Sequence, residues 1–186
     1  DQGDLVQTEG DGVARIAFAD GTLYVVRPNT LIAIEENLGA TSSTIAKVAV
    51  EVTSGMVDLS TTRSMGDSRV LFADAEARLK ADSRALVRND PSSNTREITV
   101  SKGGASMNRG ADQIELGEYE QASFADAGSP LVRKKVVAPP LLLTPANMAP
   151  VVMTGSQTVT EVEFTWAAVS TADSYRIVVS TSPLLQ

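Results

Sequence analysis

Cysteine and histidine are both absent from the 186 residues of this chain. Disulfide frameworks need cysteine, and zinc sites, thiol nucleophiles and histidine-based triads all draw on these two side chains. The sequence therefore predicts a non-enzymatic chain, with no catalytic residues, no metal site and no cofactor. It predicts that the chain binds no zinc and shows no hydrolase turnover at neutral pH.

Aromatic residues are scarce, at 4% of the chain, so the core must be built from Val, Leu, Ile and Ala. No hydrophobic run approaches the roughly 20 residues that span a bilayer, and no membrane span is expected. The formal net charge of −7 argues against a nucleic-acid partner, because a phosphate backbone would be repelled. Since Asp1 follows no signal peptide, the chain is interpreted as a mature or excised fragment.

The sequence does contain many short runs in which apolar and polar residues alternate. Such a period of two places the apolar side chains on one face of a β-strand. The first two runs predict a hairpin, because Asp20-Gly21 separates them and glycine accepts the positive φ of a tight turn. The apolar positions of this hairpin are Ala14, Ile16, Phe18, Leu23 and Val25.

Glycine residues between the alternating runs predict further turns along the chain. Ser54-Gly55 ends a run in which Val48, Val50 and Val52 alternate with other residues, and Gly103-Gly104 and Gly110 interrupt later runs. Short strands with a turn about every ten residues are typical of all-β folds. The predicted fold class is all-β, with many short strands in a sandwich or a short β-solenoid-like domain.

The segment from Ala73 to Arg84 is rich in helix-forming residues, but its hydrophobic period is that of a strand. Its apolar residues occupy odd positions, so a helix would scatter them around its circumference. The period predicts that residues 75–87 are extended. One buried face is expected to carry Ala75, Ala77, Leu79, Ala85 and Val87.

Four segments follow one another between Gly3 and about Leu131. They are Gly12-Val-Ala-Arg-Ile-Ala-Phe-Ala-Asp-Gly-Thr, Arg27-Pro-Asn-Thr, Val48-Ala-Val-Glu-Val-Thr-Ser-Gly and Ile98-Thr-Val-Ser-Lys-Gly-Gly-Ala. Their order and spacing resemble the FecR domain family. The family often has an Arg-Gly-Thr turn in mid-domain, and Ala77-Arg-Leu-Lys-Ala-Asp-Ser departs from it.

The resemblance implies an extracytoplasmic all-β domain of a bacterial envelope protein, in the periplasm or cell envelope. It implies a protein or cell-wall partner and a part in signalling. The iron-transport role of some members is not carried over. Residues 1–131 are interpreted as this domain, and residues 132–140, which include the basic run Arg133 to Lys135, as a solvated linker.

Residues 141–186 resemble the start of a fibronectin type III or immunoglobulin-like module. Val162, Phe164 and Trp166 alternate on one predicted strand, and a further strand is predicted at Tyr175, Ile177 and Val179. A full module needs about 100 residues, so this one is expected to be incomplete. Its apolar wall should pack on the first domain or form a homodimer through residues 160–180.

Several side chains are candidates for chemistry. A carboxylate pair for polysaccharide cleavage could come from Glu35-Glu36, or from Glu118 and Glu120, which share a face if both lie on a strand. Clustered oxygens for calcium could come from four aspartates, which are interpreted as turn residues. These are Asp20, Asp74, Asp82 and Asp112.

A sugar-binding platform would need exposed aromatic rings, and Phe164, Trp166 and Tyr175 are assigned to a core instead. A binding or scaffold domain needs only a rigid β surface with accessible edge strands. The predicted function is therefore a non-enzymatic, extracytoplasmic binding or scaffold domain. The alternative is a carbohydrate-binding or carboxylate-based polysaccharide-active domain.

Overall fold

The computed structural model describes residues 1–41, 45–63, 67–126, 128–146, 162–175 and 177. The chain divides into unit 1, Asp1–Val136, and unit 2, Val137–Gln186. Every regular element among the described residues is a β-strand, so the chain is all-β, as predicted.

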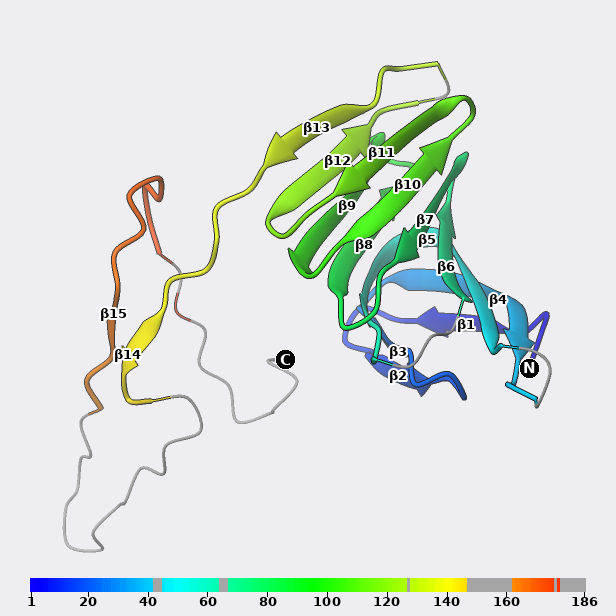
Figure 1. The fold of residues 1–186 in the computed structure, drawn as a ribbon, viewed down its shortest axis with the longest axis horizontal. Helices are drawn as coiled ribbons and strands as arrows, with labels where there is room; N and C mark the ends of the chain where they lie inside the picture. Colours follow the sequence, from blue (N-terminus) through cyan, green and yellow to red (C-terminus); the bar gives the residue numbers. More distant parts are fainter. Residues whose placement is uncertain (42–44, 64–66, 127, 147–161, 176, 178–186) are drawn as a thin grey trace, which may run out of the picture. The chain divides into compact units, whose positions relative to one another are not determined.

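Thirteen strands form the sheet of unit 1 (Figure 1). They are β1 (Leu5–Thr8), β2 (Ala14–Ala17), β3 (Leu23–Val26), β4 (Thr30–Leu38), β5 (Lys47–Ser60), β6 (Asp67–Phe72), β7 (Ala75–Leu79), β8 (Arg84–Asp90), β9 (Thr95–Lys102), β10 (Ala105–Arg109), β11 (Asp112–Leu116), β12 (Glu120–Phe124) and β13 (Val132–Lys135).

This sheet is curled and open, and it has two halves that share the long strand β5. We call sheet A the half with the order β1-β4-β5-β6-β7-β10-β11, and sheet B the half with the order β2-β3-β5-β8-β9-β12-β13. Neighbouring strands are antiparallel except β5 and β6, which are parallel. Among the strands that the structure describes, β1, β2, β11 and β13 lie at the ends of the two halves and are edge strands.

Gly55 lies where β5 passes from one half to the other. The residues before it pair with β4 and β6, and those after it pair with β3 and β8. Its φ of 99° is open to glycine, and a Cβ here would lie 2.6 Å from Thr30 Cα. The turn predicted at Ser54-Gly55 is therefore wrong: the glycine bends a continuous strand, since both of its flanks keep sheet partners.

The core lies between the two halves and is made mainly of small aliphatic side chains. In β6 and β8 buried and less buried residues alternate along the strand, as a period of two requires. The largest fully buried side chains include Tyr24, Phe72, Ile32, Leu59, Ile98 and Met107.

Residues 75–79 and 84–87 are extended, as predicted, but a turn at residues 80–83 separates them, so the prediction of one extended segment over residues 75–87 is confirmed only in part. Ala75, Ala77, Ala85 and Val87 are buried, while Leu79 is half-buried against the core. The segment contributes β7 to sheet A and β8 to sheet B. Both strands direct their apolar face into the shared core, so the period predicted burial where composition favoured a helix.

The hairpin of β2 and β3 is confirmed, but the apolar face of its second strand was assigned wrongly. Tyr24 and Val26 are fully buried, whereas Leu23 and Val25 are half-buried. The connection includes residues 18–22, where Phe18 N–H donates to the Thr22 carbonyl (2.9 Å). This longer loop sets Ile16 opposite Tyr24, which places the even residues of β3 on the core face.

Residues 132–135, predicted as part of a linker, form the edge strand β13 instead. The strand pairs with β12, with Arg133 opposite Ala122 and Lys135 opposite Glu120. All four of its residues are exposed, which suits the three cationic side chains that follow Val132. Backbone pairing with a neighbouring strand can order a segment that buries little side-chain area.

Unit 2 contains β14 (Leu142–Thr144) and β15 (Thr165–Trp166), which are antiparallel. The strand predicted to include Val162, Phe164 and Trp166 is only two residues long, and Val162 and Phe164 lie outside it. Tyr175 and Ile177 also lie outside strands, and Val179 falls outside the described residues.

Candidate functional site

Asp20, Thr22 and Ser68 form a buried, hydrogen-bonded cluster inside unit 1, which we call the polar knot. The Asp20 carboxylate accepts hydrogen bonds from the Thr22 N–H (2.8 Å), the Thr22 hydroxyl (2.7 Å) and the Ser68 hydroxyl (2.5 Å). Asp20, Thr22 and Ser68 are all buried. A carboxylate with these protein donors closes a turn and joins β6 to the β2–β3 hairpin, which is a structural role.

Tyr24 is fully buried close to this knot. Its hydroxyl donates to the Arg69 carbonyl (3.3 Å), and its ring meets Phe18 edge-on at 5.4 Å. Burial raises the pKa of the Tyr24 phenol well above its usual range, and the negative charge of Asp20 raises it further.

The raised pKa predicts a specific loss of stability at alkaline pH. Above about pH 10 the unfolded chain loses the Tyr24 proton while the folded chain keeps it, so unfolding becomes easier by about 1.4 kcal/mol per pH unit. The Tyr24→Phe variant lacks this proton. Urea unfolding of both proteins from pH 8 to pH 11 should show wild type losing stability relative to the variant above pH 10. A difference that stays constant with pH would contradict the burial of the phenol.

Glu118 and Glu120 do not lie on one strand. Glu118 is exposed in a turn that ends at Tyr119, whose φ is 58°, and β12 begins only at Glu120. The shared strand face predicted for the pair is therefore wrong. Glu120 accepts from Gly117 N–H (2.7 Å) and from Arg133 Nη2 (2.6 Å), and these donors lower the pKa of its carboxyl. A general acid needs a raised pKa, so Glu120 is unsuited to that role.

Glu35 and Glu36 do lie together, on the wall of an open groove on sheet A. A β-bulge between Ile34 and Glu36 interrupts the alternation that would otherwise turn the two side chains to opposite faces. The groove has a volume of about 560 Å³ and is also lined by Glu51 and Arg69. Arg69 Nη2 donates to Glu36 Oε2 (2.5 Å), so one member of the pair is engaged in an ion pair.

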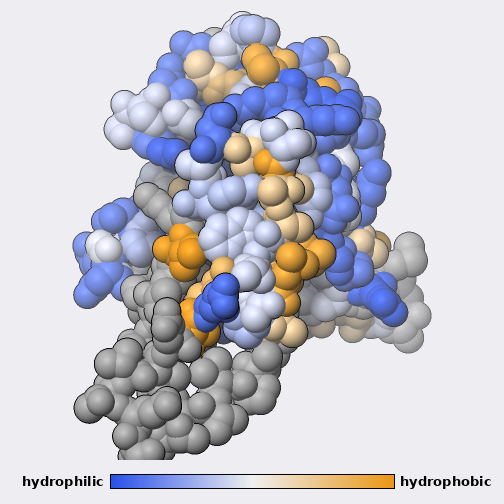
Figure 2. Space-filling model, turned by 90° about the vertical axis from the view of Figure 1, so that its left-hand side faces the viewer, coloured by the Kyte–Doolittle hydropathy of each residue, from blue (hydrophilic) through white to orange (hydrophobic). Residues whose placement is uncertain are grey.

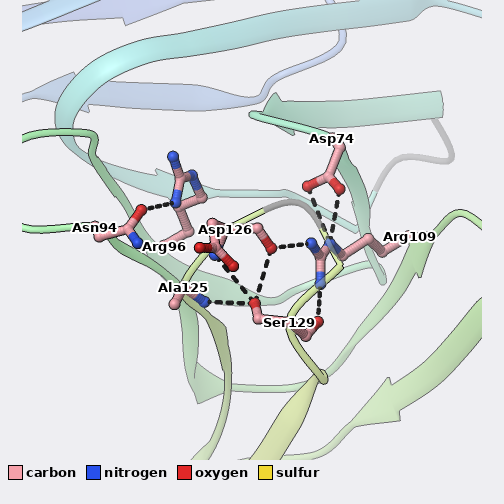
Figure 3. Close-up of polar contacts among 7 residues, drawn as sticks. All are labelled: Asp74, Asn94, Arg96, Arg109, Ala125, Asp126 and Ser129. Atoms are coloured by element: carbon pink, nitrogen blue, oxygen red, sulfur yellow. Dashed lines mark hydrogen bonds and ion pairs between the residues drawn. The ribbon is translucent and has the colours of Figure 1, made fainter.

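Arg109 makes a dense set of contacts at the end of β10 (Figure 3). Its Nε lies 3.0 Å from both carboxylate oxygens of Asp74, and its Nη atoms donate to the carbonyls of Ser129 and Asp126 (2.6 Å each). The guanidinium lies 4.0 Å from the centre of the Phe124 ring. The Arg109 side chain is only 7% exposed, so its charge is buried.

This arginine ties the two halves of the sheet together. β10 belongs to sheet A, whereas Asp126 and Ser129 follow β12 of sheet B. The contact was not predicted from the sequence, although Arg109 continues the buried positions of Ala105 and Met107. A cation at an apolar position of an alternating strand is the local signal that could have indicated it.

The four aspartates considered for calcium lie in separate places. Asp20 is buried in the knot, the carboxylates of Asp74 and Asp82 face Arg109 and Lys102, and Asp112 is exposed on β11. The Arg109 hydrogen bond lowers the pKa of Asp74, and Lys102 lowers that of Asp82. Across the described ranges, no three acidic side chains converge as ligands for a metal ion.

Unit 2 has an apolar groove of about 360 Å³ lined by Phe164, Trp166 and Tyr175, among others. The rings of Trp166 and Tyr175 lie 5.4 Å apart, and the Tyr175 hydroxyl accepts from Val169 N–H (2.6 Å). Trp166 is half-buried, but Phe164 is 43% exposed and Tyr175 39%. Their assignment to a closed core is therefore wrong within the described part of unit 2. Figure 2 shows hydrophobic side chains, in orange, at the molecular surface.

No helix in the part of the chain that the structure describes is both long and apolar enough to cross a membrane.

The fold of this chain is similar to that of solved structures. Two crystal structures of a proposed anti-sigma factor from Parabacteroides distasonis are similar to this chain, with TM-scores of 0.60 and 0.59 and sequence identities of 13% and 14%. Each similarity covers 72% of this chain and 60% of the other, so the chain spans about 60% of the length of those proteins. No family model and no curated protein matches the sequence. The similarity establishes a shared fold.

Proposed function

We propose that this chain is a non-enzymatic, extracytoplasmic binding domain of a FecR-type bacterial envelope protein, which engages a protein partner in signalling. The observation that carries the proposal is the fold shared with the two anti-sigma factor structures over 72% of the chain. Anti-sigma factors act by binding other proteins, and we expect a domain of similar fold to be suited to protein binding as well.

The segments that resemble the FecR family belong to the framework of unit 1. Residues 12–22 include β2 and the knot loop, residues 48–55 lie in the first part of β5, and residues 98–105 connect β9 to β10. Residues 27–30 join β3 to β4. These positions determine the path of the sheet, so the resemblance supports a common scaffold whose partner binds at its surface.

The carboxylates support a role without catalysis. Glu120 is held ionised by its donors, and Glu36 pairs with Arg69. Asp20 is enclosed by hydroxyl and amide donors inside the fold. In each case the acidic side chain organises neighbouring protein groups, which is how a structural carboxylate behaves.

A second function is favoured by the groove of unit 2. Its partly exposed rings of Phe164, Trp166 and Tyr175 can stack against the apolar faces of a sugar, as ligand sites with aromatic walls do. Unit 2 would then bind an envelope polysaccharide.

One comparison separates the two functions. Wild type and the Trp166→Ala variant are applied to an array of bacterial envelope glycans, and both are also photo-crosslinked in periplasmic extract. The first proposal expects the same discrete protein adduct with both chains and no glycan retained. Glycan retention by wild type that falls at least tenfold in Trp166→Ala, but not in Trp166→Phe, would establish the second function in its place. Release of reducing ends from peptidoglycan would overturn the non-enzymatic role.

A further inference from the structure

The edge strand β13 has one open side. Within the described ranges β13 pairs with β12 alone and ends the path of sheet B (Figure 1). All four residues, Val132 to Lys135, are exposed. An open edge presents backbone donors and acceptors to which an extended segment of another protein can pair.

The hydrogen-bond phase of the ladder shows which backbone groups face outward. Val136 N–H donates to the Tyr119 carbonyl (2.8 Å), in the same register as the pairing of β13 with β12. In an antiparallel ladder every second residue directs its backbone N–H and C=O groups to the same neighbouring strand. Lys134, two residues before Val136, therefore also bonds to β12. The N–H and C=O groups of Arg133 and Lys135 therefore point away from the sheet, into the open edge.

The charge of β13 is opposite to that of the chain as a whole. Arg133 is neutralised by Glu120, which its Nη2 contacts at 2.6 and 2.7 Å. Among the described residues neither Lys134 nor Lys135 forms an ion pair, although Lys135 lies opposite Glu120 and interacts with it over a longer distance, so the strand keeps an excess of positive charge in a chain of net charge −7.

These charges restrict which strand can pair with this edge. Two copies of β13 would bring their lysines together, and like charges on neighbouring strands are unfavourable. At the other exposed end of the sheet, β11 carries Asp112 and Glu115, so its acidic edge would repel an acidic segment. Of these two edge strands, β13 is therefore the one suited to an acidic extended segment.

We propose that β13 is the docking strand for an extended, acidic segment of the partner protein, which adds to sheet B beside Arg133 and Lys135. This assignment rests on the proposed function and names the surface and the chemistry of the partner. Backbone pairing supplies the main contacts. Lys134 and Lys135 are consecutive on β13, so their side chains lie on opposite faces of the sheet, and alternate glutamates or aspartates of the segment can share the face of Lys135 and Arg133.

The test uses the full chain, labelled with nitrogen-15, and a blocked seven-residue peptide in which glutamate alternates with valine between terminal threonines. Amide hydrogen exchange is followed residue by residue. Added peptide should slow exchange at least tenfold at Arg133 and Lys135, the outward amides, and leave Val132 and Lys134 unchanged because they already bond to β12. Binding should weaken as salt is raised.

Charge reversal gives matched controls. The Lys134→Glu/Lys135→Glu variant should bind the peptide at least tenfold more weakly. Arg15→Glu, on the edge strand β2 at the other end of sheet B, should bind like wild type, since Arg15 is exposed and distant along the sheet order. A peptide with lysine in place of glutamate should not bind. Normal amide spectra of each variant establish that it is folded.

Equal weakening by Arg15→Glu would overturn the assignment, because it would show a response to net charge alone. Unchanged amide exchange at Arg133 and Lys135 at millimolar peptide would also overturn it. So would self-association through β13, seen as a molar mass that rises with protein concentration in wild type but not in Lys134→Glu/Lys135→Glu. Those results would leave any protein adduct found in periplasmic extract intact, so failure of the docking strand and failure of the proposed function are distinguishable.

Discussion

Replacement of Arg109 by alanine should lower the free energy of unfolding by about 3 kcal/mol. The change leaves the carbonyls of Asp126 and Ser129 without their charged donor, and removes the cation from the face of the Phe124 ring. It also unpairs Asp74, although that carboxylate is 48% exposed and regains water. Urea unfolding at pH 7 measures the loss.

Two variants test whether geometry or charge is responsible. Arg109→Lys keeps the charge but lacks the planar fork, so it should recover only part of the loss. Arg78→Ala removes an exposed arginine that pairs with Glu76 and Asp67, and should cost less than about 1 kcal/mol. Equal losses for Arg109→Ala and Arg78→Ala would contradict a linking role for Arg109.

Acid should weaken the same contact. Arg109 lowers the pKa of Asp74, so the folded state favours its ionised form. The contribution is complete above the unfolded pKa of about 3.9 and is lost as pH falls through the lower folded value. The stability difference between wild type and Arg109→Ala should therefore narrow only at strongly acidic pH.

Local periodicity predicted the all-β class and many of the strands of unit 1. Ala75, Ala77, Ala85 and Val87 are buried because every second side chain of a strand turns to the same face, whatever the helix propensity of its neighbours. The turns at Gly103-Gly104 and Gly110 also separate strands as predicted. These features depend on residues close together in the sequence.

Contacts between distant segments could not be read in this way. The loop of residues 18–22, longer than a two-residue turn, sets Tyr24 rather than Val25 on the core face, and β13 becomes a strand only because β12 is beside it. Arg109 reaches a loop that begins sixteen positions later in the sequence, at Ala125. Sequence patterns predict which residues are buried, but not which residues they contact in the fold.

The carboxylate candidates show the same limit. Glu118 and Glu120 were paired on the assumption of a continuous strand, and the positive φ of Tyr119 ends that strand between them. Glu35 and Glu36 share a groove because of a bulge that alternation alone does not indicate. In both cases an irregularity of the backbone, a turn before β12 or a bulge in β4, determines where the two carboxylates lie.

Among the glycines that the structure describes, Gly55 should be the one whose replacement by alanine has the largest effect, a loss of at least about 3 kcal/mol in the free energy of unfolding. The φ of 99° is strained for any L side chain, and the new Cβ would lie 2.4 Å from Thr30 Oγ1 and 2.7 Å from the Asn29 carbonyl oxygen. Relief would require β5 to move at the point where it joins the two halves of the sheet. Urea unfolding and the soluble yield of the variant measure the effect.

Gly110→Ala is the matched control, because its φ of 58° is also positive but no atom lies within 4 Å of the added Cβ. It should cost only about 1 to 2 kcal/mol, the strain of the left-handed conformation by itself. Thr30→Ala should not rescue Gly55→Ala, since the Thr30 Cα and the Asn29 carbonyl are backbone atoms that truncation leaves in place. Similar losses in the two glycine variants, or full rescue by Thr30→Ala, would show that β5 can bend without the close approach at Gly55.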